Sequence, residues 1–267
     1  MSYFEIVHPT SGNAPIVLSV PHCGATIPDE LKESFKPEQL QFIDDTDWFV
    51  EQLYSFGPEL GITLISAKIS RWVIDLNRDP ENKPLYSDGR VITDVCPATD
   101  FLGNPIYADD RKFVDAETRQ IRIEKYYKPY HSAIAQCLTD RKKEFGKVLL
   151  WDCHSIRQYV PSIRKEKFPD LILGDADGTS ASPGLIECAL KNLETSGNTV
   201  SHNYPFKGGF ITRHFGQPAV NTHALQLEMS KINYMDDSET RWMSSRATRI
   251  QDLLKRTLSN LSEAMLS

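Results

Sequence analysis

Two histidines stand directly behind apolar runs that are typical of strands. His22 follows the run "PIVLSV" at residues 15–20, with Pro21 and Gly24 enforcing a turn around it, and His154 follows "KVLLWD" at residues 147–152. Because the carboxyl ends of strands in an open α/β sheet face the ligand crevice, both side chains are well placed for chemistry. One such histidine is more often a satisfied loop or core residue, but two at two strand ends predict a shared metal site.

A hydrolytic zinc site needs a further protein ligand, commonly a carboxylate, and an open position for water. The segment "DDTDW" supplies Asp44, Asp45 and Asp47 at the entrance of a predicted helix. Capping the first turn of that helix is the most common duty of such residues, and we expect one of the three to do so. We expect Asp47 to be the metal ligand, with Asp45 as the alternative.

Cysteines lie next to both histidines and raise the alternative of a thiol nucleophile. Neighbouring side chains in extended chain point to opposite faces, so Cys23 and Cys153 should pack into the core if the histidines face a site. The five cysteines are odd in number and form no CxxC pair, which favours reduced thiols over disulfides or a cysteine zinc cluster. The thiol-nucleophile interpretation is therefore disfavoured.

An arginine-rich motif, "SRWVIDLNRDPEN", places Arg71 before one apolar run and Asn77 and Arg78 after it. Arginine binds carboxylates through a planar fork, and a neighbouring asparagine adds a directional amide. The motif therefore predicts binding of a carboxylate. The alternative is structural, with an arginine paired to Asp75 or Asp79.

Two later motifs also carry candidate functional groups. Glu228 ends an alternating strand pattern, where a buried carboxylate costs several kcal/mol unless it is paired or metal-associated, so it is either half of an ion pair or a catalytic base. The motif "PFKGGFITRHFG" contains Gly209, Thr212 and Arg213, which are candidates for binding a second substrate carboxylate. A glycine-rich hairpin with solvated charges is an equal alternative for this motif.

Strand and helix patterns alternate along the chain. Strands are predicted at residues 15–20, 62–69, 72–76, 147–152, 208–215 and 219–229 and near residue 171, and helices at 36–56, 115–145, 184–195 and 238–265. This order predicts an α/β fold of three layers, with a mostly parallel mixed sheet between helices on both faces, in a single domain of residues 1–267. Residues 79–108 are rich in Pro, Gly, Asn and Asp and predict a functional loop or an insertion. His131, inside a helical pattern, is more typical of a packed or surface histidine than of a ligand.

Composition restricts the classes of partner. The net charge of −6 comes from 36 acidic and 30 basic residues without a block of either sign, so we expect neither nucleic acid nor membrane as a partner. No run approaches the roughly 20 apolar residues that span a bilayer, and no basic segment precedes an apolar one at the N-terminus. We expect a cytoplasmic protein that acts on a small molecule. Its oligomeric state is left open.

Taken together, the ordered motifs resemble a known family. The set "PHCG", "DDTDWFVEQLY", "SRWVIDLNRDP", "KPYHSAI", "LLWDCHS", "LILGDADGTS", "PFKGGFITRHFG" and "LQLEM" is similar to the N-formylglutamate amidohydrolase family over residues 16–235. A more remote similarity links "DLNR" and the two histidines to aspartoacylase and the zinc carboxypeptidases. The resemblance implies a zinc-carboxypeptidase-like fold.

The resemblance also implies a metal centre in which His22 and His154 bind zinc and Asp47 is the third ligand, with cobalt or manganese as alternative metals. The wider zinc peptidase class often has a glutamate three residues after its first histidine. This chain has Ala25 at that position, so its acidic ligand must come from elsewhere.

For the substrate, the resemblance implies that Arg78 with Asn77 holds an α-carboxylate and that Arg71 polarises the scissile carbonyl. Glu228 matches the glutamate that serves as general base and acid. The expected reaction is hydrolysis of N-formyl-L-glutamate to formate and L-glutamate, a step of histidine breakdown. The alternatives are a zinc hydrolase of another N-acyl amino acid, a carboxypeptidase-like peptidase, or a noncatalytic amino-acid or metal-binding protein.

Overall fold

The computed structural model describes residues 2–84, 94–109 and 114–267, so part of the predicted loop at residues 79–108 lies outside the described residues. The described strands form one seven-stranded sheet in the order β1-β3-β2-β4-β7-β5-β6. They are β1 (Phe4–Val7), β2 (Ile16–Val20), β3 (Thr63–Ala67), β4 (Val148–Ile156), β5 (Leu171–Gly174), β6 (Val200–His202) and β7 (Thr222–Ser230). Strands β3, β2, β4 and β7 are parallel, whereas β1 and β5 each run antiparallel to a neighbour. The predicted mostly parallel mixed sheet is confirmed.

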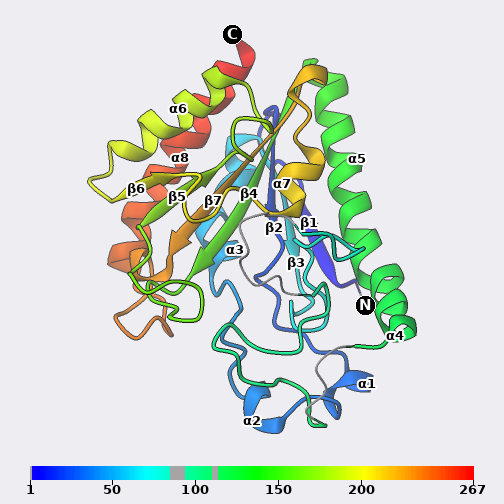
Figure 1. Ribbon diagram of the computed structural model, residues 1–267. Helices are drawn as coiled ribbons and strands as arrows, with labels where there is room; N and C mark the ends of the chain where they lie inside the picture. The colour runs from blue at the N-terminus through cyan, green and yellow to red at the C-terminus, as the bar shows by residue number, and fades with distance from the viewer. Residues whose placement is uncertain (1, 85–93, 110–113) are drawn as a thin grey trace.

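Helices cover both faces of this sheet (Figure 1). Helix α5 (Lys128–Phe145) packs on one face, and α6 (Pro183–Glu194) and α8 (Ser244–Leu266) pack on the other. The central strand β4 is buried along its whole length, with Leu149 and Trp151 facing α8 and Val148 and Leu150 facing α5. A strand buried on both sides reads as a continuous apolar run, which is why "KVLLW" was recognisable in the sequence.

Shorter elements complete the fold. They are the helices α1 (Asp29–Lys32), α2 (Pro37–Leu40), α3 (Val50–Leu53), α4 (Ala116–Arg122) and α7 (Phe210–Phe215), a π-helical turn at Ile123–Tyr127, and 3-10 turns at Gly57–Leu60, Pro218–Val220 and Lys231–Asn233. Among the described helices, none combines the length and apolar character needed to cross a membrane.

Several predicted elements differ in the structure. The segment 72–76 is not a strand but a buried series of turns after β3, and 208–215 is not a strand but the helix α7. The predicted helix 36–56 is wrong in its middle, because only α2 and α3 form and the aspartates lie in the irregular chain between them. Phe49, with a left-handed φ of 66°, precedes α3, so none of the aspartates caps this helix.

Candidate metal and catalytic site

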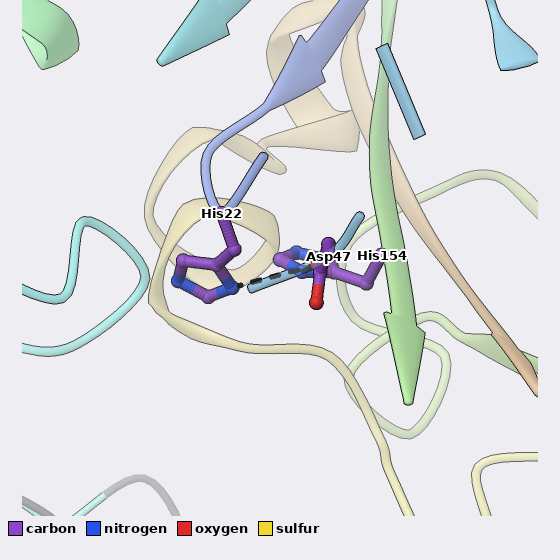
Figure 2. Close-up of side chains that lie close together, drawn as sticks. All are labelled: His22, Asp47 and His154. Atoms are coloured by element: carbon purple, nitrogen blue, oxygen red, sulfur yellow. Dashed lines mark ion pairs between the residues drawn. The ribbon is translucent and has the colours of Figure 1, made fainter. Parts of the chain in front are cut away.

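Three buried side chains meet at the carboxyl edge of the central strands. His22 follows β2, Asp47 lies in the loop before α3, and His154 lies near the end of β4; one ligand atom from each lies within 4.8 Å of the others. Asp47 Oδ2 is 3.3 Å from Nδ1 of His154 and 3.8 Å from Nδ1 of His22. Figure 2 shows the three side chains gathered together, with dashed lines that mark the ion pairs of Asp47 with the two histidines. The residues predicted as metal ligands are therefore brought together.

The local chain explains this convergence. Strands β2 and β4 are parallel neighbours, so their carboxyl ends emerge side by side. The backbone N–H of Asp47 donates to the carbonyl of His22 at 2.9 Å and ties the aspartate loop to the first histidine. A Cβ on Gly24 would lie 2.4 Å from the carbonyl oxygen of Ile69, so only glycine permits the turn that carries His22.

Each histidine is oriented by a second carboxylate. His22 Nε2 lies 2.7 Å from Oδ1 of Asp75, and His154 Nε2 lies 3.0 Å from Oδ2 of Asp152. A proton on Nε2 that is donated to a carboxylate leaves the lone pair of Nδ1 directed toward Asp47. The structure thus favours the tautomer that a metal-binding imidazole requires in His22, whereas Nε2 of His154 lies 3.0 Å from both Asp152 Oδ2 and Asn77 Nδ2.

The charge states of the two rings differ. Burial, aided by the positive charge of Arg71, lowers the pKa of His22 to about 4, so this ring is neutral at pH 7. Burial also opposes a charge on His154, but the carboxylates of Asp152 and Asp47 outweigh it and hold the pKa of His154 well above its usual range. A metal ion would therefore compete with a proton for His154.

The donor set fits a metal ion of the zinc type. Asp47 Oδ2 is buried and makes no hydrogen bond among the described residues; it lies only at ion-pair distance from the two Nδ1 atoms, so a cation between these three atoms would satisfy it. Two imidazoles and one carboxylate make a typical three-ligand set for catalytic zinc, which keeps a fourth position open. The orphaned oxygen and the two facing Nδ1 atoms are the structural case for a bound cation.

Asp45 and Asp44 have other roles. Asp45 accepts hydrogen bonds from Trp72 Nε1 at 2.8 Å and from the backbone N–H of Phe101 at 3.0 Å. Asp44 is paired with Arg157. Asp45, the alternative third ligand, is not part of the His22–Asp47–His154 cluster, and its two oxygens join the aspartate loop to two other segments.

Glu228 lies beside His154 because of strand register. In the parallel β4–β7 pair, His154 is opposite Glu228 and Asp152 is opposite Gln226, so all four side chains share one face of the sheet. Within the described residues, the partly exposed Glu228 carboxylate has no hydrogen-bond or ion-pair partner. Burial raises the pKa of Glu228 to about 8. Glu228 therefore has no ion-pair partner among the described residues, and its role as a catalytic base stays a prediction.

The two arginines share one carboxylate. Arg71 Nη2 donates to Asp75 Oδ2 at 2.6 Å, and its guanidinium lies 4.5 Å from the centre of the Phe101 ring. Arg78 Nε lies 3.8 Å from the same Asp75 oxygen, and its side chain is 25% exposed. Asp75 thus holds both arginines as well as His22, and Arg78 is the more accessible of the two.

Asn77 differs from expectation. Its Oδ1 accepts from the backbone N–H of Ile211 at 2.8 Å. Its Nδ2 lies 3.0 Å from His154 Nε2, 3.3 Å from Asp152 Oδ2 and 3.4 Å from Gln226 Oε1. Its side chain is therefore occupied by the protein rather than presented to a substrate carboxylate. A Cβ on Gly209 would lie 2.4 Å from Asn77 Nδ2, so this glycine lets α7 approach the amide closely.

The remaining predicted substrate residues lie on α7. Thr212 is buried with its Oγ1 lacking a hydrogen-bond partner among the described residues. Arg213 Nε donates to the carbonyl of Gly208 at 3.0 Å. The predicted hairpin is thus a helix that the Asn77 amide fastens to the sheet, and the substrate roles of Thr212 and Arg213 stay predictions.

Two partners of the site residues, Asp152 and Gln226, are not predicted from the sequence, and Asp75 is predicted only in part. A signal existed for Asp152, because a residue two positions before His154 on a strand shares its face. The predicted pairing of Asp75 with an arginine is confirmed by Arg71, whereas the contact of Asp75 with His22 depends on the turn that replaces the predicted strand. No sequence signal indicated Gln226.

The thiols are placed as expected. Cys153 is fully buried in the core that faces α8, and burial raises its pKa well above the usual range. The Cys23 thiol donates to the carbonyls of Val20 and Ala67, and burial raises its pKa strongly as well. Neither cysteine has the lowered pKa that a nucleophilic thiol needs.

Comparisons with known proteins identify the relatives of this chain. The sequence model of the N-formylglutamate amidohydrolase family matches residues 14–235. An N-formylglutamate deformylase of Pseudomonas putida is 38% identical over 253 residues, covering 94% of this chain and 93% of the relative. A protein of the same name from Pseudomonas aeruginosa is 39% identical over 235 residues, covering 87% of this chain and 86% of the relative.

Solved structures show the same fold. The crystal structure of N-formylglutamate amidohydrolase from Ralstonia eutropha JMP134 is similar with a TM-score of 0.81 and 29% identity, covering 99% of this chain and 98% of that one. A gene product from Agrobacterium tumefaciens is similar with a TM-score of 0.72 and 19% identity over 97% of this chain and 96% of that one. The family match and the relatives cover most of the chain, and the chain belongs to the N-formylglutamate amidohydrolase family.

Proposed function

We propose that this protein hydrolyses N-formyl-L-glutamate to formate and L-glutamate in a metal-dependent reaction. The observation that carries the proposal is the buried cluster of His22, Asp47 and His154, with an orphaned carboxylate oxygen, next to the unpartnered Glu228. Two relatives that are more than a third identical carry the name N-formylglutamate deformylase. The reaction would take place in the cytoplasm as a step of histidine breakdown.

The metal would be held by His22, Asp47 and His154, and zinc suits this donor set, with cobalt or manganese as alternatives. When bound, such an ion acts as a Lewis acid and lowers the pKa of a bound water molecule toward neutrality. Asp75 and Asp152 would keep both imidazoles in the ligand tautomer, since their oxygens hold the two Nε2 atoms.

Glu228 would move the protons. A carboxyl group with a pKa of about 8 can accept a proton from water and return it to the departing amine near neutral pH, because its proton affinity is close to the balance point. Its lack of a competing partner within the described residues leaves both oxygens available for this transfer.

The two arginines would bind and polarise the substrate. Arg71, buried and fixed by Asp75, would stabilise the negative charge that develops on the formyl oxygen. Arg78, partly exposed, would bind the α-carboxylate and so orient the formyl carbon toward the metal ligands. Since the Asn77 amide is occupied, we assign the α-carboxylate to Arg78 without it.

The test is formate release from N-formyl-L-glutamate by the purified protein as isolated, after chelation, and after zinc is restored. Activity that disappears with the chelator and returns with zinc is the expected result. An enzyme that hydrolyses N-acetyl-L-glutamate or a peptide but not the formyl substrate would instead show a different N-acyl specificity. No release from any of these substrates by a zinc-loaded protein would refute the proposed function.

A further inference from the structure

The backbone of residues 76–78, which leads to Arg78, is held by one face of the long helix. Tyr127 Oη donates to the carbonyl of Arg78 at 2.8 Å, and His131 Nε2 donates to the carbonyl of Leu76 at 2.8 Å. The two donors are four residues apart, so they are stacked on the same side of the helix. They bind the carbonyls immediately before and after Asn77.

The helix contains a π-helical turn at the position of Tyr127. Tyr127 ends a π-helical turn, Ile123–Tyr127, that joins α4 to α5. A π-turn places one extra residue in the helix and turns the side chains that follow, and such turns are common at functional sites. The turn therefore sets the direction in which the side chains of Tyr127, at its end, and His131, in the first turn of α5, project.

The two rings hold each other in place. Their centroids are 4.0 Å apart with an interplanar angle of 14°, and His131 also stacks with Phe215 of α7 at 5.8 Å and 18°. Burial lowers the pKa of His131 to about 4, so the ring is neutral at pH 7 and its single proton belongs on Nε2, which faces a carbonyl. Because Tyr127 and Phe215 pack on the imidazole, the ring is held with its Nε2–H directed at the carbonyl of Leu76.

The same short segment is held from its other side. The Asn77 side chain accepts from Ile211 and donates to Asp152, and the Asn77 backbone N–H donates to Asp75 at 2.9 Å. Residues 76–78 thus have hydrogen bonds to α5, α7, β4 and Asp75. A side chain that starts from so constrained a backbone loses less conformational freedom when it binds a ligand.

We propose that Tyr127 and His131 are positioning residues for Arg78, and that their two hydrogen bonds set the affinity of the enzyme for the substrate α-carboxylate. This inference rests on the proposed function, in which Arg78 binds that carboxylate. Both side chains bind backbone carbonyls and neither belongs to the His22–Asp47–His154 cluster. Their loss should therefore weaken substrate binding and leave the chemical step largely intact.

The experiment compares Tyr127→Phe with Tyr130→Phe in the zinc-loaded enzyme. Tyr130 lies on the same helix and is fully buried, but its hydroxyl is 3.0 Å from Ser19 Oγ and does not reach residues 76–78. Removing one neutral hydrogen bond should raise KM for N-formyl-L-glutamate by about three- to tenfold in Tyr127→Phe, with kcat within about twofold. Tyr130→Phe should lower the melting temperature but keep the wild-type KM.

Two further arms test whether Arg78 carries the effect. In a double-mutant cycle, Tyr127→Phe should add little to the KM of Arg78→Ala, because the arginine it positions is already absent. His131→Leu should raise KM, whereas His131→Gln, which keeps an amide donor, should raise it less. Wild-type discrimination against the α-amide of the substrate should also shrink in Tyr127→Phe.

The outcomes separate the two hypotheses. A wild-type enzyme that releases no formate would refute the proposed function and this inference with it. Wild-type turnover together with an unchanged KM in Tyr127→Phe, or fully additive effects with Arg78→Ala, would refute the inference alone. A fall in kcat without a change in KM would also overturn it, since that result would place Tyr127 in the chemical step.

Discussion

Replacing Asp75 by Asn should damage both stability and metal binding. The Asp75 carboxylate accepts from Arg71 Nη2 at 2.6 Å, His22 Nε2 at 2.7 Å and the backbone N–H of Asn77 at 2.9 Å. Its side chain is only 2% exposed. An asparagine has the same shape, but one of its two ends is a donor that would face another donor.

The size of the loss in stability or in metal affinity depends on which neighbour the amide nitrogen of the asparagine faces. In either orientation the buried Arg71 guanidinium loses its closest countercharge, which costs about 3–5 kcal/mol, and the cost is greatest when the amide nitrogen faces Arg71. If it faces His22, the ring must place its proton on Nδ1, the atom turned toward Asp47, and losses of this kind reduce metal affinity about 10- to 100-fold. We therefore expect a lower free energy of unfolding, weaker zinc binding, or both.

The pH dependence gives a further check on Asp75. Burial alone would raise its pKa, but Arg71, Arg78 and His22 hold the pKa well below the usual range. A depressed carboxyl pKa contributes stability that is complete above the ordinary value of about 4 and is lost as pH falls below it. The difference in stability between wild type and Asp75→Asn should therefore be constant from pH 6 to 8.

The assay is urea unfolding at pH 7 combined with zinc competition against a chromophoric chelator. Asp175→Asn is the matched control, because Asp175 is also buried and bound to Asn203 and His202, but at the end of β5. The control should lose stability and keep zinc affinity. An Asp75→Asn protein with wild-type stability and wild-type zinc affinity would refute the reasoning that this carboxylate joins the arginine to the metal ligand.

Three other substitutions test separate parts of the site. Glu228→Gln should lower kcat by about 10²- to 10⁴-fold while zinc content measured by atomic emission stays unchanged, since the proton carrier is lost but no ligand is. Gly209→Ala should lose about 1–3 kcal/mol in urea unfolding, because its Cβ would meet the Asn77 amide at 2.4 Å, whereas Gly184→Ala, with no heavy atom within 4 Å of its Cβ, should not. Because burial lowers the pKa of His131 from 6.5 to about 4, wild type should lose up to about 3 kcal/mol of stability as pH falls across that interval, and His131→Gln should show a shallower loss.

The candidate ligands could be predicted because they obey local rules. His22 and His154 follow apolar runs that are strands β2 and β4, and parallel strand ends meet at one edge of a sheet whatever the loops do. Asp47 was favoured over Asp45 in the sequence without a decisive signal. The distinction comes from Trp72 and Phe101, which occupy Asp45 from distant parts of the chain.

The rest depended on tertiary contacts that periodicity does not encode. The run at residues 72–76 is apolar enough for a strand, but it forms buried turns that bring Asp75 within hydrogen-bond distance of His22. The segment 208–215 was read as a strand from its β-branched and aromatic residues. It forms α7 because Gly209 lets the chain pass against Asn77, whose Oδ1 then accepts the first-turn N–H of Ile211.

Glu228 makes no hydrogen bond among the described residues, unlike the groups that hold the histidines and the backbone of the site. Asp75, Asp152 and Asn77 are each fixed by two or more hydrogen bonds, which suits groups that must hold a ligand or a backbone in one orientation. A group that exchanges protons with water and substrate must instead keep its lone pairs available, and among the described residues Glu228 has no such bond. The register that sets it beside His154 supplies its position through the backbone alone, so the strand pair β4–β7 fixes the carboxylate near the metal ligands without restraining its proton.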